Sequence, residues 1–178
     1  MDEQASLLAA IHEDVVLQAH DPAWPARFAE ERERLLGLGP DLFIDVQHIG
    51  STAVPGLTAK PIIDLLAGVA SMAVARGLAE RVAGWGYTGS AEFNATLAER
   101  QWFMRHANGH CTHHLHVVVH GGPAWQDRLR FRDVLCADPG VAARYAALKQ
   151  QLAQAHATDR EAYTQAKETF VRRVLEGA

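Results

Sequence analysis

The sequence predicts a single α+β domain, with a mixed β-sheet and its helices in the first two-thirds of the chain and only helices in the last third. Three observations predict this fold. The chain has 178 residues, and one domain usually takes roughly 100–200. Short runs rich in β-branched and aromatic residues alternate with helical patterns until shortly before Trp125. From Trp125 onward the pattern is helical throughout. We therefore expect residues 1–178 to form one domain.

The first part of the chain supplies the helix and strands that lead to the predicted site. In chain order we expect a β-rich run (15–17), a helix (24–36), a strand (42–49), a loop rich in Gly, Ser, Thr and Pro (50–60) and a buried strand (61–66). Pro22 and Pro25 can open this helix, which places Phe28 and Leu35 inward. The run 61–66 is almost continuously apolar, which is typical of a strand covered on both faces.

The second part adds two strands and the C-terminal helices. We expect a helix over residues 70–83, no readable pattern over 84–100, strands at 101–106 and 113–119, and three C-terminal helices separated at 138–140 and 158–159. Asn108-Gly109 predicts a hairpin turn between the two strands. The apolar and aromatic positions of the C-terminal helices predict core packing, and they include Trp125, Leu129, Tyr145 and Leu148.

Composition and charge limit the possible partners. The net charge is -4, from 17 basic and 21 acidic side chains, and duplex nucleic acid usually requires a basic footprint. The two cysteines predict no disulfide framework. The first residues are acidic where a signal peptide would be basic, and no apolar run is long enough to span a bilayer. We expect a cytoplasmic protein that binds neither duplex nucleic acid nor membrane.

The Gly50-Ser51 turn is the first candidate for chemistry. A strand that ends in this turn leaves free backbone N–H groups and hydroxyls at the sheet edge, which suit a phosphate. The predicted phosphate-binding residues are Gly50, Ser51, Thr52, Lys60 and Arg100. The alternative is a plain strand-to-loop turn with solvated basic side chains.

Asp64 is the second candidate, because it stands within the apolar run Ile62-Ile63-Asp64-Leu65-Leu66. A buried carboxylate is costly unless it is paired or bound to a metal. Perturbed charges cluster at functional sites, so we interpret Asp64 as a functional carboxylate. A structural salt bridge from Asp64 to an arginine is the alternative.

The third candidate is the histidine-bearing strand at residues 113–119. Alternation places His114, His116 and His120 on one face, opposite an apolar face. Two imidazoles at i and i+2 are close enough to share one cation. The alternative is a solvated or internally bonded histidine face.

Three neighbouring residues are assigned no part in chemistry. His106 and His110 flank the predicted hairpin turn and are expected to face solvent. Cys111 could join a metal site, but its position at a strand start favours a structural role.

Taken together, these residues resemble the signature of the GrpB family. The resemblance rests on HIGSTAVPGL at residues 48–57, AKPIID at 59–64, HDPAWP at 20–25 and HHLHV at 113–117. It runs over about residues 14–171. The family resembles a branch of the nucleotidyltransferase superfamily typified by DNA polymerase beta. The resemblance therefore implies a nucleotidyltransferase-like sheet.

In that superfamily a Gly-Ser or Gly-Gly turn precedes a strand with two carboxylates two residues apart, and a third carboxylate lies on a later strand. These carboxylates hold two magnesium ions. Here Gly50-Ser51 and Asp64 fit, but Leu66 occupies the second position, and His114 and His116 stand on the later strand. The resemblance then implies either a site rebuilt around a different cation or a loss of transferase activity.

Three functions remain open from the sequence. The first is an enzyme that acts on a nucleotide or other phosphorylated small molecule, as a metal-dependent nucleotidyltransferase or phosphoesterase. Its catalytic residues would be Asp64 and Ser51, and its metal ligands Asp64, His114 and His116. The second is a non-catalytic nucleotide- or metal-binding module of the same fold, and the third is a purely structural or partner-binding domain. The nitrogen ligands predict zinc or manganese rather than magnesium.

Overall fold

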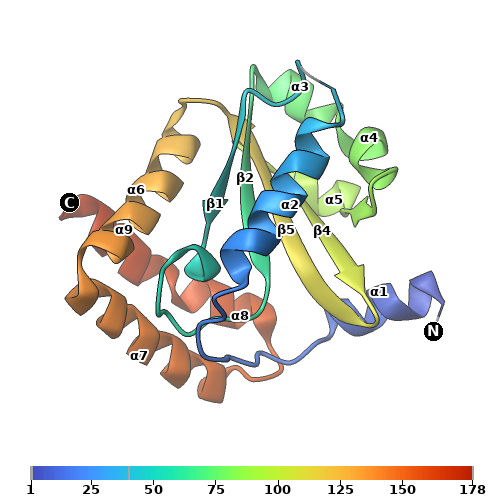
Figure 1. Cartoon of the computed structure of the whole chain (residues 1–178). Helices are drawn as coiled ribbons and strands as arrows, with labels where there is room; N and C mark the ends of the chain where they lie inside the picture. Colours follow the sequence, from blue (N-terminus) through green and yellow to red (C-terminus); the bar gives the residue numbers. More distant parts are fainter. Residues whose placement is uncertain (1, 40, 178) are drawn as a thin grey trace.

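The structure is a computed structural model that describes residues 2–39 and 41–177, so Met1 and Ala178, the ends of the predicted domain, lie outside it. Within this part of the chain, five strands form one sheet in the order β1-β2-β5-β4-β3 (Figure 1). The strands are β1 (Asp45–Ile49), β2 (Ile63–Val69), β3 (Tyr87–Thr88), β4 (Gln101–Ala107) and β5 (His110–Val119). β2 and β5 pair in parallel and the other neighbours pair antiparallel, which confirms the predicted mixed sheet.

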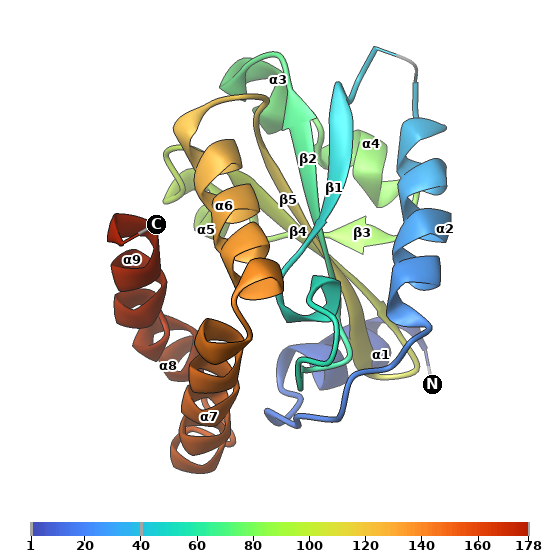
Figure 2. The same cartoon turned by 60° about the vertical axis from the view of Figure 1, so that its left-hand side comes forward.

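The helices cover both sides of this sheet. They are α1 (Glu3–Ile11), α2 (Trp24–Leu36), α3 (Met72–Arg76), α4 (Ala79–Ala83), α5 (Ala91–Ala95), α6 (Pro123–Ala137), α7 (Pro139–Ala155), α8 (Arg160–Ala166) and α9 (Glu168–Glu176), with a short 3-10 helix, η1, at Ser51–Ala53. Figure 2 shows α2 and α6 on opposite sides of the sheet. The helical C-terminal third is confirmed. No helix of the described residues is both long and apolar enough to cross a membrane.

Strand β2 is buried on both faces, as its apolar run predicts. Leu65 packs in the core cluster that includes Trp24 of α2. Leu66 points to the other side and packs with Val118 of β5 and Trp125 of α6. Asp64 shares the face of Leu66, since side chains alternate along a strand. The fold therefore places this carboxylate on the side of the sheet where the C-terminal helices lie.

Several predicted elements are correct. The helix at residues 24–36 has the predicted bounds. Asn108 (φ 52°) and Gly109 (φ 83°) form the turn of the β4–β5 hairpin, because two successive positive φ angles suit a tight hairpin turn.

Other predicted elements are wrong. The run at residues 15–17 forms no strand, and the nearest pairing is an isolated bridge from Gln18 to Ala59. The helix predicted at residues 70–83 is interrupted at Gly77 and becomes α3 and α4. The described C-terminal part holds four helices rather than three, since the chain breaks again at Lys167 between α8 and α9. Helices α1 and α5 were not predicted.

Candidate functional site

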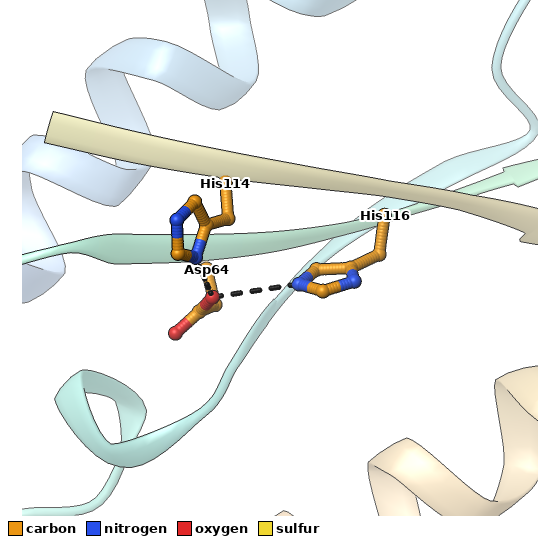
Figure 3. A group of neighbouring side chains, drawn as sticks. All are labelled: Asp64, His114 and His116. Atoms are coloured by element: carbon orange, nitrogen blue, oxygen red, sulfur yellow. Dashed lines mark hydrogen bonds and ion pairs between the residues drawn. The ribbon is translucent and has the colours of Figure 1, made fainter. Parts of the chain in front are cut away.

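The parallel register of β2 and β5 brings the three predicted metal ligands together. It aligns Asp64 with His114 and Leu66 with His116. Asp64 Oδ1 lies 3.1 Å from His114 Nδ1 and 3.4 Å from His116 Nε2 (Figure 3). One ligand atom from each residue lies within 4.8 Å of the other two. The predicted convergence is confirmed, while metal binding itself stays a prediction.

The electrostatics of this cluster keep Asp64 ionised. Burial opposes ionisation of Asp64, but hydrogen bonds from His114 and His116 outweigh it and hold the pKa of the carboxyl far below its usual range. Burial lowers the pKa of His114, yet the bond to Asp64 raises it to about 9. Burial prevails at His116 and lowers its pKa to about 4. Within the described residues, the partners of Asp64 are these histidines and not an arginine: His114 forms an ion pair with it, and His116, neutral at pH 7, forms a hydrogen bond.

The Gly50-Ser51 turn lies against this carboxylate. Gly50 has a φ of +71°, and a Cβ atom at this position would lie 2.4 Å from Asp64 Oδ2. Only glycine adopts this conformation easily and also leaves room for the carboxylate. The Gly50-Ser51 turn is therefore packed onto Asp64 of the carboxylate–histidine cluster.

Thr52 differs from the other predicted phosphate ligands, because its hydroxyl already has partners. It donates to the Ile62 carbonyl oxygen at 3.3 Å and lies 3.0 Å from His48 Nε2. Its side chain is buried, with 1% exposed. Thr52 therefore holds the turn in place, and its hydroxyl is not free to bind a phosphate.

A cavity of about 770 Å³ joins the carboxylate–histidine cluster to the predicted phosphate ligands. Its wall includes Gly50, Ser51, Thr52, Lys60, Asp64, Arg100, His114 and His116. All of the predicted site residues thus line one cavity, although they come from four separate parts of the chain.

Two lysines of the C-terminal helices complete this wall, and neither was predicted as a site residue. Lys149 of α7 is 2% exposed, and its Nζ donates to Ser51 Oγ at 3.0 Å and to the Thr58 carbonyl oxygen. Lys167, between α8 and α9, lies 4.3 Å from the centre of the Tyr163 ring, and Lys60 lies 5.4 Å from the same centre. The structure thus collects three ammonium groups at one end of the cavity.

Burial and repulsion between ammonium groups lower the pKa values of Lys149 and Lys167. Burial lowers the pKa of Lys149 to about 7, helped by the charges of Lys167 and Lys60. Burial and the charge of Lys60 lower the pKa of Lys167 to about 8. Ammonium groups held together against repulsion favour an anion between them. This end of the cavity can therefore hold phosphate groups.

The lysines escaped prediction because charged residues on a helix are usually solvated, and only the docking of α7 and α8 turns them inward. Tyr145, predicted to pack, does so, with its ring centre 5.3 Å from that of Phe131, but it also lines the cavity.

Three other histidines discussed above, His106, His110 and His120, have partners outside the cluster. His120 packs on Trp125, with ring centres 4.7 Å apart. His110 is exposed, as predicted, and pairs with Glu13. The prediction that His106 faces solvent is wrong, because its Nδ1 lies 2.9 Å from Ser6 Oγ and the ring is half-buried. Cys111 is buried in a small apolar cluster with Ala10 and Met104.

The second carboxylate position of the superfamily pattern is filled by a core residue. Leu66 is fully buried, with 0% exposed, and packs with Ile49, Val118 and Trp125. Among the described residues that line the cavity, the acidic ones are Asp64 and the exposed Glu161. The cavity therefore offers one buried carboxylate, too few for two magnesium ions held by carboxylates.

Comparison with known proteins places this architecture among related chains. The GrpB protein family matches residues 14–177. The chain is 38% identical over 180 residues to UPF0157 protein YqkA of Bacillus subtilis, covering 98% of this chain and 51% of YqkA. It therefore spans about half the length of that relative. It is 35% identical to glutamate-rich protein GrpB of Alkalihalophilus pseudofirmus, covering 91% of this chain and 94% of the relative.

A solved structure has the same fold. The crystal structure of the conserved protein GrpB from Enterococcus faecalis superposes with a TM-score of 0.80 at 32% sequence identity. The match covers 91% of this chain and 96% of the other. The α+β architecture described above is thus shared with an experimentally determined relative.

Proposed function

The chain belongs to the GrpB family, and from that premise we propose that it binds a nucleotide or another phosphorylated small molecule together with a divalent metal and acts on the phosphate. The metal ligands in this proposal are Asp64, His114 and His116. One observation carries it: a single cavity joins this three-donor cluster to a wall of lysines. On a chain of net charge -4, so local a concentration of cations supports binding of a small anion.

The donor set fits a first-row metal better than magnesium. Two imidazole nitrogens and one carboxylate suit zinc or manganese, whereas magnesium favours oxygen ligands. Three protein ligands leave coordination positions open. When bound, such a metal supplies a Lewis acid for a phosphoryl oxygen and an activated water. Asp64 is suited to the role because its partners keep it ionised.

The other residues of the cavity bind and orient the phosphate. Ser51 lines the same cavity as Asp64, and its hydroxyl accepts a hydrogen bond from the Lys149 ammonium. Lys60, Lys167 and Arg100 add positive charge along the same wall. A phosphate that reaches the donor cluster is therefore surrounded by cations, which favour the charge that develops during phosphoryl chemistry. Asp64 and Ser51 are the proposed catalytic residues.

The reaction class follows from what the cavity lacks. With Leu66 in the core, the two-magnesium nucleotidyl transfer of the superfamily does not fit these residues. A reaction with one metal, either hydrolysis of a phosphoester or a nucleotidyl transfer, fits the donor set. The same burial of Leu66 favours a second candidate, a module that binds the ligand without turnover.

Binding and turnover are tested separately. Metal-stripped protein is screened by thermal shift against nucleotides and phosphorylated metabolites, with and without zinc, manganese or magnesium. A ligand at 100 times its dissociation constant should stabilise the protein by about 2.7 kcal/mol. Product analysis with a labelled nucleotide pool then separates the enzyme from the binding module.

The matched control compares two aspartates. Asp64→Asn should abolish the metal-dependent stabilisation, and Asp41→Asn, at an exposed position, should leave it unchanged. The absence of any stabilising phosphorylated ligand, with or without metal, would contradict the proposal.

A further inference from the structure

One end of the cavity is apolar and has no part in the chemistry proposed above. Its wall is formed by Leu7 and Ile11 of α1, Phe93 of α5, and Trp102 and Met104 of β4. Ile11 is 46% exposed and Phe93 is 44% exposed. Large apolar side chains that gather in a cavity rather than singly on the surface mark a ligand-binding wall.

Helix α1 is anchored, so this wall has a defined position. Ala10 is fully buried against Met104 and Cys111. Ser6 Oγ accepts the Gly109 N–H at 2.9 Å and hydrogen-bonds to His106 Nδ1. These contacts bind one face of α1 to the β4–β5 hairpin, and they leave Ile11 over the cavity.

The apolar wall adjoins the metal-ligand cluster through one aromatic ring. The ring centre of Trp102 is 5.9 Å from that of Phe93, at an interplanar angle of 86°. On its other side it is 5.2 Å from that of His114, at 55°. Because His114 also contacts Asp64, a group that packs on this wall lies close to the phosphate.

We infer that the ligand of this cavity is a phosphate ester that carries a planar aromatic ring on a short link, with the ring packed against Phe93, Trp102 and Ile11. The inference rests on the proposed function, whose phosphate end it extends. An aromatic ring suits this wall because aromatic pairs pack edge-to-face or offset-stacked, and the Phe93–Trp102 pair already has an edge-to-face arrangement. Leu7 and Ile11 precede the segment matched by the family, so this preference depends partly on residues outside the match.

The test uses three small phosphate esters and the metal-loaded protein. Calorimetric titration compares phenyl phosphate, n-butyl phosphate and glycerol 3-phosphate, which share the phosphate and differ in the attached group. Phenyl phosphate should bind about tenfold more tightly than glycerol 3-phosphate, in line with the energy of aromatic stacking. Tighter binding of phenyl than of n-butyl phosphate supports the planar ring.

Two variants and a control assign the effect to the wall. Phe93→Ala and Ile11→Ala should each reduce the preference for phenyl phosphate several-fold without changing the affinity for glycerol 3-phosphate. Leu8→Ala is the control, because Leu8 is also an exposed apolar residue of α1, at 52%, and is absent from the cavity wall.

The outcomes are distinguishable from failure of the proposed function. Equal affinity for phenyl phosphate and glycerol 3-phosphate would overturn the inference while leaving the phosphate site intact. Equal affinity for phenyl and n-butyl phosphate would overturn the aromatic assignment. If none of the three esters bound, the proposed function itself would fail.

Discussion

The backbone of Gly50 lies so close to the carboxylate of Asp64 that a side chain at position 50 would overlap it, with Cβ 2.4 Å from Oδ2. This contact joins the turn proposed to bind phosphate to the predicted metal ligand. A substitution at either residue should therefore alter both the turn and the position of the carboxylate.

The first prediction follows from this contact. Gly50→Ala should weaken metal binding at least tenfold, because the added methyl displaces Asp64, and should also lower stability by about 1–3 kcal/mol, since the backbone of Gly50 (φ 71°, ψ -172°) lies in a region that only glycine adopts readily. Gly56→Ala is the matched control, since Gly56 has a φ of +75° and nothing within 4 Å of its Cβ position. Both variants carry the backbone strain, and only Gly50→Ala carries the overlap. Equal metal affinity in the two variants would show that the overlap does not matter.

The second prediction concerns metal preference. Metal-stripped protein should bind zinc or manganese more tightly than magnesium, because two of its three ligands are nitrogens. His114→Ala and His116→Ala should each weaken zinc binding at least tenfold and leave the fold intact. His110→Ala, an exposed histidine of the same strand, should bind like the wild type. Calorimetric titration measures all four proteins, and magnesium binding as tightly as zinc would refute the histidine–metal assignment.

The third prediction is a pH dependence of anion binding. Lys149 and Lys167 have pKa values lowered to about 7 and about 8, so each is charged below its pKa and neutral above it. Affinity for sulfate, which does not titrate in this range, should decrease as pH rises from 6 to 9. Lys149→Gln should remove the part of the decrease centred near pH 7. A pH profile of sulfate affinity unaffected by this substitution would contradict the role of Lys149.

Stability without an anion should depend on pH in the opposite direction. The unfolded state binds more protons than the folded state between the lowered pKa of Lys149 and its ordinary value of 10.5. The free energy of unfolding therefore gains from rising pH in this window. Denaturant unfolding of wild type and Lys149→Gln at pH 7 and pH 9 measures it, and the wild type should show the larger gain.

The fourth prediction concerns the position of the absent carboxylate. Leu66→Asp should lower the free energy of unfolding by about 3 kcal/mol or more, because the charge would be buried beside Val118 and Trp125. Leu66→Met should change it by less than about 1.5 kcal/mol, since it conserves volume and polarity. Denaturant unfolding compares the two variants. A Leu66→Asp variant as stable as the wild type would show that the second carboxylate position is accessible to solvent.

Strand chemistry explains what the sequence revealed about the site. Alternation placed His114 and His116 on one face, and the unexpected charge in an apolar run identified Asp64. Neither signal depends on distant parts of the chain. The register that aligns Asp64 with His114 is a tertiary feature, yet the convergence was predictable because both segments were expected in one sheet.

The missed residues depend on helix docking. Lys149 becomes a cavity residue only because α7 packs against the Ser51–Thr58 loop, and its sequence neighbours resemble those of an ordinary surface lysine. Helix α1 was missed as well, and its two exposed large apolar residues, Leu8 and Ile11, differ in that only Ile11 lines the cavity. Local sequence patterns do not indicate how a helix docks on the rest of the fold.

The pairing of β2 with β5 has a consequence for how the protein folds. It is the parallel pair of the described sheet, and parallel neighbours require a long crossover between them. Asp64 and its histidines are 50 and 52 positions apart along the chain, so the site cannot exist until this crossover is closed. Contacts of such long sequence separation form slowly. A metal at this site would therefore bind only to molecules in which β2 and β5 are already paired. It should slow unfolding more than it speeds folding.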